Sequence, residues 1–137
     1  MLRSFKRNLD SLERIFEFIE EFFRATPMVN EHRYPIAFAI EELFTNMVKY
    51  NPRGTSDIQV QLQHDEKKIT VDIVDFGETA FDLTKCDDVD IERPLKDRKP
   101  GGLGIYLTRK IMDEIHYTFT NGESRTTLVK YLENRNV

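Results

Sequence analysis

The apolar residues of this chain change their spacing at about Ile58, from the period of a helix to the period of a strand. Before that point, two segments place apolar residues three or four positions apart, as helices that bury one face do. The first pattern covers residues 12–23, with Asp10 available as an N-cap and Pro27 as a stop. The second runs from about residue 31 to 50 and ends at the sequence NPRG. We therefore expect two amphipathic helices in the N-terminal part of the chain.

Beyond Ile58, apolar and polar residues alternate over 58–62 and 69–75, which predicts two strands joined by the charged turn QHDEKK. The charged stretch 82–100 follows and has few apolar residues. Loops of this length are uncommon inside a compact domain unless they are functional or mobile. The remaining expected elements are a helix over about 102–114 and strands over 115–119 and 128–132, separated by the turn NGES.

This order of elements predicts the fold class. Consecutive strands joined by short turns pair antiparallel, and grouped helices cover one face of the resulting sheet. We therefore predict an α/β (α+β) two-layer sandwich, in which a mainly antiparallel sheet is covered on one face by helices. A chain of 137 residues is long enough for one domain with a sizeable core and too short for two ordinary domains. Residues 1–137 are expected to form a single domain.

Composition narrows the classes of function. The single cysteine, Cys86, excludes an intramolecular disulfide framework and a cysteine-based zinc site, which fits a reducing compartment. No apolar run approaches the roughly 20 residues of a membrane span, and the N-terminus lacks the apolar core of a signal peptide. The net charge of −4 gives no basic footprint for nucleic acid. We expect a cytoplasmic protein that binds neither membrane nor nucleic acid directly.

Glu42 and Asn46 are the first candidate site, in the sequence IEELFTNMVKY of the second expected helix. Residues four apart lie on neighbouring turns of one helix face, and this pair falls well away from the centre of the apolar stripe. A carboxylate can accept a proton there, and an amide can offer its carbonyl oxygen to a hard cation such as Mg²⁺. The alternative is an ordinary solvated helix face.

Asp75 is the second candidate, in the sequence VDIVDFG. Counting in steps of two from Ile69 places Asp75 on the side of the strand that the core should occupy. A buried carboxylate needs a partner, and no Arg or Lys is nearby in the sequence. A ligand with an amino group, such as adenine, would provide that partner. The alternative is that the strand ends at Val74 and that Asp75 begins a turn with Gly77.

The third candidate is the glycine-rich stretch RKPGGLGIYLTRKIM, which leads directly into a helical pattern. Glycines at the start of a helix let backbone N–H groups approach an anion, and the helix dipole favours phosphate there. The sequence has neither a P-loop nor the third glycine of a dinucleotide-binding motif, because Leu107 stands at that position. A simple entry turn is the alternative.

The order of these three motifs resembles the ATP-binding domain shared by histidine kinases, DNA gyrase, heat-shock chaperones and mismatch-repair ATPases, known as the Bergerat fold. Within this superfamily, the chain is most similar to the bacterial anti-sigma factor serine/threonine kinases, also called switch-protein kinases. The resemblance spans nearly the whole chain, so it implies one histidine kinase-like ATPase domain. The segments that carry it are EELFTNMVKY, VDIVDFGETAFD and RPLKDRKPGGLGIYLTRKIMDEIHY.

The resemblance implies a role for each candidate. Glu42 matches the general base of the family, and Asn46 matches its Mg²⁺ ligand. Asp75 matches the acid that receives the amino group of adenine, and Gly77 gives the base room to approach.

The glycine-rich stretch acquires a role in the same way. Gly102 and Gly104 match the glycines that wrap the phosphates of ATP, and Gly101 and Leu103 belong to the same nucleotide-binding segment. The loop of residues 82–100 corresponds to the ATP lid.

Two positions depart from the family pattern. Thr79, which we include among the nucleotide-binding positions, stands where a second glycine often follows Asp-x-Gly, and Pro100 stands where relatives often have a glycine or a basic residue. Cationic contact to the γ-phosphate is then expected from Arg98, Lys99 or Arg93. The alternative for each of these three is a solvated charge on the lid.

The resemblance implies an ATP-dependent protein serine/threonine kinase. Such kinases phosphorylate an anti-sigma factor antagonist with a STAS fold, and they also hold a sigma factor inactive. Many are homodimers, so a homodimer is expected. The alternative is a binding module without catalysis, which uses ATP as a structural ligand and sequesters a regulatory partner.

Overall fold

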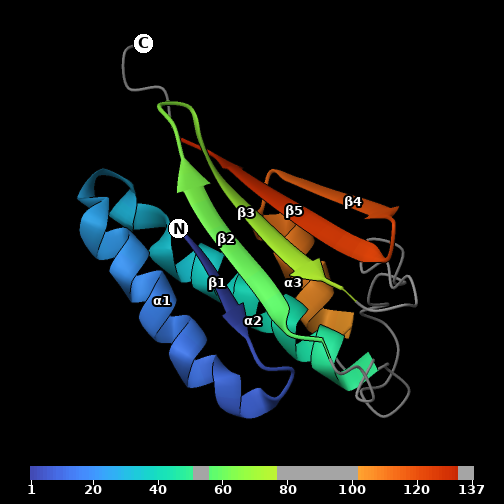
Figure 1. Ribbon diagram of the computed structural model, residues 1–137. Coiled ribbons are helices and arrows are strands. Elements are labelled where there is room, and N and C mark those ends of the chain that lie inside the picture. The colour runs from blue at the N-terminus through green and yellow to red at the C-terminus, as the bar shows by residue number, and fades with distance from the viewer. Residues whose placement is uncertain (51–55, 77–101, 133–137) are drawn as a thin grey trace.

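The computed structural model describes residues 1–50, 56–76 and 102–132, and these contain a sheet and its covering helices (Figure 1). The strands of the sheet are β1 (Leu2–Phe5), β2 (Ile58–His64), β3 (Lys68–Asp75), β4 (Glu114–Thr120) and β5 (Glu123–Tyr131). The α-helices are α1 (Leu12–Ala25), α2 (Arg33–Tyr50) and α3 (Gly102–Ile111), and the 3-10 helices are η1 (Leu9–Ser11) and η2 (Pro27–His32).

The described strands form one sheet in the order β1-β2-β3-β5-β4, and every neighbouring pair is antiparallel. The two predicted hairpins, β2–β3 and β4–β5, are confirmed. Asn121 and Gly122 turn the second hairpin with φ angles of 52° and 78°. Two consecutive positive φ angles are typical of the primed turns that match strand twist, and Asn-Gly is the preferred sequence for them.

The core lies between the sheet and the helices. Ile58, Val60 and Leu62 of β2 are fully buried, because alternate residues of a strand point to the same face. Figure 1 shows the helices on one side of the sheet, and the buried apolar residues of both layers form one cluster. The predicted two-layer sandwich with helices on one face is therefore confirmed.

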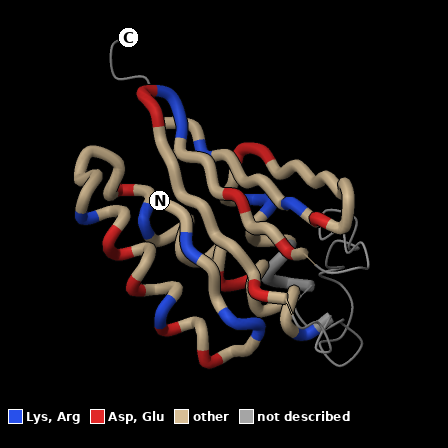
Figure 2. The backbone as a smooth tube through the Cα atoms, in the orientation of Figure 1, with Lys and Arg blue, Asp and Glu red and all other residues tan. Residues whose placement is uncertain are grey.

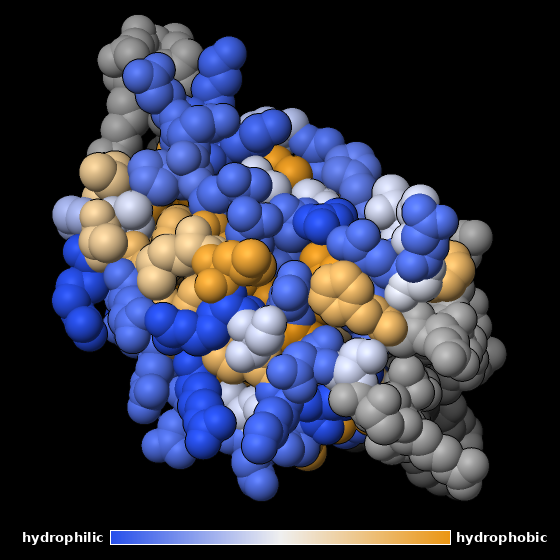
Figure 3. All heavy atoms as spheres, in the orientation of Figure 1, coloured by the Kyte–Doolittle hydropathy of each residue, from blue (hydrophilic) through white to orange (hydrophobic). Residues whose placement is uncertain are grey.

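The outer face of the sheet is mostly hydrophilic (Figure 3). Asp72, on the central strand β3, accepts a hydrogen bond of 2.5 Å from the Thr127 hydroxyl of β5. The Arg125 guanidinium lies 3.6 Å from the same carboxylate. The carboxylate is therefore both hydrogen-bonded and close to a cation, as a largely buried charge requires.

The structure differs from the sequence-based expectation at the N-terminus. Strand β1 was not predicted, although it pairs with β2 and buries Phe5. Asp10 was predicted as the N-cap of the first helix, and this is wrong. Asp10 lies inside η1, so that Ser11 occupies the N-cap position of α1.

Helix α1 shows the amphipathic pattern on which its prediction depended. Its buried face includes Ile15, Phe18 and Phe22. Figure 2 shows acidic and basic residues along the rest of the helix. Among the described residues, no helix is both long and apolar enough to cross a membrane.

Candidate functional site

Helix α2 carries the first candidate pair. Asn46 is only 1% exposed, and its side-chain nitrogen donates a hydrogen bond of 2.6 Å to the backbone carbonyl of Glu42. This bond fixes the orientation of the amide. The other amide atom, Asn46 Oδ1, is buried and has no hydrogen-bond partner among the described residues. A buried polar atom is normally paired, so this oxygen is available to bind a ligand.

The burial of Asn46 overturns the solvated-face alternative for this residue. The apolar stripe of α2 faces the sheet and α1, and Asn46 lies outside that stripe. Helix α3 also packs against α2. Thr108 of α3 is buried, as is Met112, which follows the end of the helix. Helix α2 is therefore in contact with other helices on more than one side, and the apolar stripe alone does not predict which of its residues are buried.

Glu42 is half-buried, one helical turn before Asn46. Burial raises the pKa of its carboxyl above the ordinary value of 4.5, and the negative charge of Glu41 raises it further. Lys49 acts in the opposite direction and lowers this pKa. A carboxylate with a raised pKa is a stronger base than an exposed one, which suits general-base catalysis.

Asp75 is the last residue of β3 and is 6% exposed. The prediction that it lies on the core side of the strand is confirmed, and the alternative that the strand ends at Val74 is wrong. The structure adds a partner that the sequence did not indicate. The guanidinium of Arg7, from the connection between β1 and η1, forms a salt bridge with the Asp75 carboxylate. A bound nucleotide is therefore not the only possible partner for this charge.

Two polar residues of β5 lie beside Asp75, and the sequence analysis missed them. Ser124 pairs directly with Asp75, and Thr126 pairs with Ile73, so their side chains share the inner face of the sheet. The Thr126 hydroxyl is buried without a partner among the described residues, whereas Ser124 accepts a hydrogen bond of 3.2 Å from the Tyr117 hydroxyl. The sequence did contain a signal for their position, because Ser124 and Thr126 alternate with the same spacing as the buried Leu128 along β5 and so share its face.

The candidate segments meet at one end of the molecule. Figure 1 shows the C-terminal ends of α2 and β3 and the first turn of α3 at this end. The predicted helix after the glycine-rich stretch is confirmed, and Gly102 to Gly104, with Leu103 between them, form its start. The other predicted nucleotide-binding residues lie outside the described residues, as does the predicted lid 82–100. They are Gly77, Thr79, Arg98, Lys99 and Gly101.

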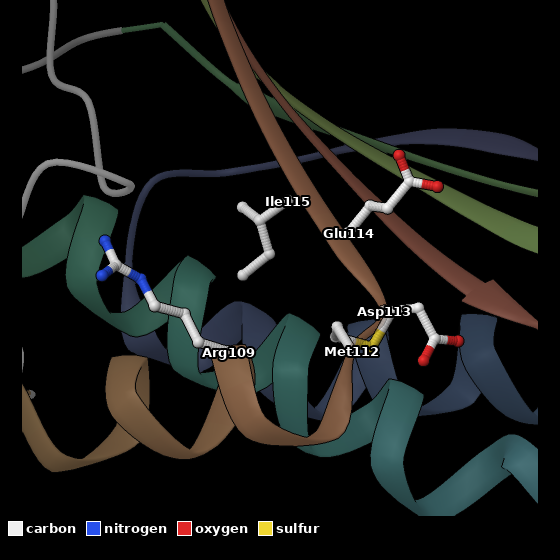
Figure 4. A pocket seen from close by; sticks show the side chains of 5 residues that line it. All are labelled: Arg109, Met112, Asp113, Glu114 and Ile115. Carbon is white, nitrogen blue, oxygen red and sulfur yellow. The ribbon is translucent and has the colours of Figure 1, made fainter.

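A separate hollow of about 280 Å³ lies where α3 leads into β4. Figure 4 shows the side chains that line it, which include Arg109, Met112 and Ile115. None of the predicted site residues lines this hollow, so it is not the candidate site.

The described residues contain no group of three or more His, Cys, Asp or Glu side chains that could hold a metal ion. The amide oxygen Asn46 Oδ1 is a suitable ligand for Mg²⁺, which prefers oxygen ligands and usually keeps only one or two from the protein. The residues present therefore fit a Mg²⁺ ion that is bound mainly through a nucleotide.

Comparison with known proteins gives a family match over most of the chain. The sequence pattern of the family described as the histidine kinase-like ATPase domain matches residues 5–130. The serine-protein kinase RsbW of Listeria monocytogenes serovar 1/2a is 29% identical over 108 residues, which cover 74% of this chain and 68% of that protein.

Two further relatives are similar at the same level. The serine/threonine-protein kinase BtrW of Bordetella bronchiseptica is 27% identical over 101 residues, covering 72% of this chain and 70% of that protein. The serine-protein kinase RsbW of Halalkalibacterium halodurans is 31% identical over 93 residues, covering 64% of this chain and 56% of that protein.

Proposed function

The chain belongs to the family of histidine kinase-like ATPase domains, and on that premise we propose that it is an ATP-dependent protein serine/threonine kinase. We propose further that it acts as an anti-sigma regulatory factor in the cytoplasm. Its substrate is an anti-sigma factor antagonist with a STAS fold, and it also sequesters a sigma factor. The names of the similar proteins, which are serine or serine/threonine kinases, support the enzyme class.

The observation that carries the proposal is the pair on α2. Glu42 is half-buried with a raised pKa, and Asn46, one turn later, has a buried carbonyl oxygen without a partner. Glu42 takes the proton from a serine or threonine hydroxyl of the substrate as that hydroxyl attacks the γ-phosphate. Positioning and neutralisation of charge supply most of the catalysis in phosphoryl transfer, so few catalytic groups are needed.

Asn46 binds Mg²⁺ through its carbonyl oxygen in this proposal. The ion would neutralise charge on the phosphates of ATP. The hydrogen bond from the Asn46 amide nitrogen to the Glu42 carbonyl holds the metal ligand one turn from the base. The helix thus places the two residues one turn apart, and the bond to the backbone orients the amide of Asn46.

Asp75 receives the amino group of adenine, next to the buried hydroxyl of Thr126 on the neighbouring strand. Gly77 and Thr79 follow Asp75 in the sequence and are proposed to contact the adenine ring. The phosphates are assigned to Gly101, Gly102, Leu103 and Gly104, whose N–H groups precede or begin α3. Arg98 and Lys99, in the lid of residues 82–100, are the candidate cations for the γ-phosphate.

We propose that the protein is a homodimer and that nucleic acid and membranes are not direct partners. A second candidate function is a binding module, because the kinase and the binding module would share the same nucleotide-binding residues. A binding module without catalysis would retain Asn46, Asp75 and the glycines and would use ATP only to hold a regulatory protein.

The substitution Glu42→Gln tests the proposal. The variant keeps the size of the side chain and removes the base, so we expect phosphorylation of a purified STAS-fold antagonist to fall at least about 100-fold. ATP affinity should change little. Glu41→Gln is the matched control, because the adjacent residue lacks the spacing to Asn46, and it should retain most of the rate. Transfer at the wild-type rate by Glu42→Gln would show that the base is assigned wrongly.

A further inference from the structure

Arg7 is buried beside Asp75, where the adenine base of ATP is proposed to bind. Its position in the sequence gives no indication of a role there. Its side chain is 3% exposed, and one terminal nitrogen, Nη2, donates to Asp75 Oδ1. Its Nε donates a hydrogen bond of 3.2 Å to the backbone carbonyl of Ser56. The other terminal nitrogen, Nη1, is buried and has no partner among the described residues.

An unpaired N–H of a buried guanidinium is unfavourable, so Nη1 indicates an acceptor that is absent from the structure. Both terminal nitrogens are bonded to the same carbon atom, and therefore Nη1 lies close to the Asp75 carboxylate that Nη2 contacts. The site thus presents an acceptor, the carboxylate, and a donor, Nη1, next to each other. Thr126, whose buried hydroxyl also lacks a partner among the described residues, lies on the same inner face of the sheet.

An adjacent acceptor and donor match one edge of a 6-aminopurine. Its exocyclic amino group donates hydrogen bonds, and the neighbouring ring nitrogen N1 accepts one. A 6-oxopurine carries an acceptor at position 6 and a proton on N1. In the same orientation it would therefore place its carbonyl against the carboxylate and its N1–H against the guanidinium.

We propose that Arg7 is a specificity-determining residue that donates from Nη1 to N1 of adenine, while Asp75 accepts from the exocyclic amino group. Arg7 is also a positioning residue, because its bonds to Asp75 and Ser56 hold the carboxylate in place. The proposal rests on the proposed function for the assignment of Asp75, and it adds a second group that distinguishes adenine from 6-oxopurines.

The opposite role for Arg7 would be to occupy the base site until ATP displaces it. Displacement would break the contacts with both Asp75 and Ser56 and would leave the Asp75 carboxylate buried without this cation. The two contacts and the 3% exposure of the side chain therefore favour a guanidinium that stays beside the bound base.

The test is calorimetric titration of the full chain with ATP and with 1-deaza-ATP, which has a C–H group in place of N1. The wild type should bind 1-deaza-ATP about tenfold more weakly than ATP, the effect expected for one hydrogen bond to a charged group. The analogue 7-deaza-ATP, altered at the opposite side of the ring, is the control and should bind within about twofold of ATP. Equal affinity of the wild type for ATP and 1-deaza-ATP overturns the proposal without any variant.

The variant Arg7→Lys keeps the positive charge and removes the forked pair of donors. In this variant, 1-deaza-ATP should bind within about twofold of ATP, because an ammonium that pairs with Asp75 has no second arm directed at N1. If Arg7→Lys does not give the circular dichroism spectrum of the wild type, the wild-type titrations with ATP and 1-deaza-ATP decide the proposal alone. A tenfold loss that persists in the folded variant overturns the proposal, as does a variant that binds ATP more tightly than the wild type.

These measurements require no phosphoryl transfer. A wild type that binds ATP with the predicted dependence on N1, but phosphorylates no protein, contradicts the proposed kinase and supports the role of Arg7. A wild type that phosphorylates its partner but binds 1-deaza-ATP as tightly as ATP contradicts only the role of Arg7.

Discussion

Removal of the Arg7 guanidinium should destabilise the folded protein strongly. The side chains of Arg7 and Asp75 are 3% and 8% exposed, so Arg7→Met leaves a carboxylate buried without its cation. Breaking a buried ion pair in this way costs about 3–5 kcal/mol, which is a large part of the roughly 5–15 kcal/mol that stabilises a typical domain. The melting temperature should fall by about 10–17 °C.

Urea unfolding followed by circular dichroism measures this loss as a shift of the midpoint. The double variant Arg7→Met/Asp75→Asn should be less destabilised than Arg7→Met, because it no longer buries a carboxylate that has lost its cation. Glu21→Gln is the control for an exposed ion pair, since Arg3 and Glu21 are both 45% exposed, and it should change the free energy of unfolding by less than about 1 kcal/mol. A loss below about 1 kcal/mol for Arg7→Met would contradict this prediction, because it would mean that the buried pair contributes no more than an exposed one.

Two further predictions concern α2. Glu42 must be unprotonated to act as a base, so kcat should fall with decreasing pH around a pKa above 4.5. The charge of Glu41 raises the pKa of Glu42, so Glu41→Gln should move this fall in kcat to lower pH. The charge of Lys49 lowers the same pKa, so Lys49→Gln should move the fall to higher pH. A pH profile of kcat that neither variant shifts would contradict the assignment of Glu42 as the base. Phe44→Ala should lower the free energy of unfolding by about 3–5 kcal/mol, because Phe44 is fully buried. Phe16 is 38% exposed, so Phe16→Ala should have a much smaller effect. Equal losses of the two variants in urea unfolding would contradict the placement of Phe44 in the core.

The layers of the fold could be predicted because each pattern is local. Alternating residues within β2 and β3, and the three-to-four-residue spacing within α1, are properties of single segments that the sheet and helices preserve. Strand β1 could not be predicted in this way. It has four residues, of which only Phe5 is buried, and it depends on pairing with β2.

The site was predictable in part for the same reason. Counting along β3 gave the inward direction of Asp75. Asn46 is buried although it lies outside the apolar stripe of its own helix, and a single-helix pattern could not show this. Arg7 and Asp75 are 68 residues apart, and Ser124 meets Asp75 only across the β3–β5 pairing. These contacts are consequences of topology, whereas the roles of the glycines and the lid remain predictions.

We propose that this histidine kinase-like domain transfers phosphate to a serine or threonine of a protein. The most direct measurement incubates the purified wild-type chain with ATP labelled in the γ-phosphate, Mg²⁺ and a STAS-fold antagonist protein from the same genome, and then treats the antagonist with acid. We predict label on the antagonist that is stable to acid, as a phosphoserine or phosphothreonine is. Binding of ATP and antagonist without transfer of label would contradict the kinase and favour the binding module, and acid-labile label would indicate a histidine acceptor instead.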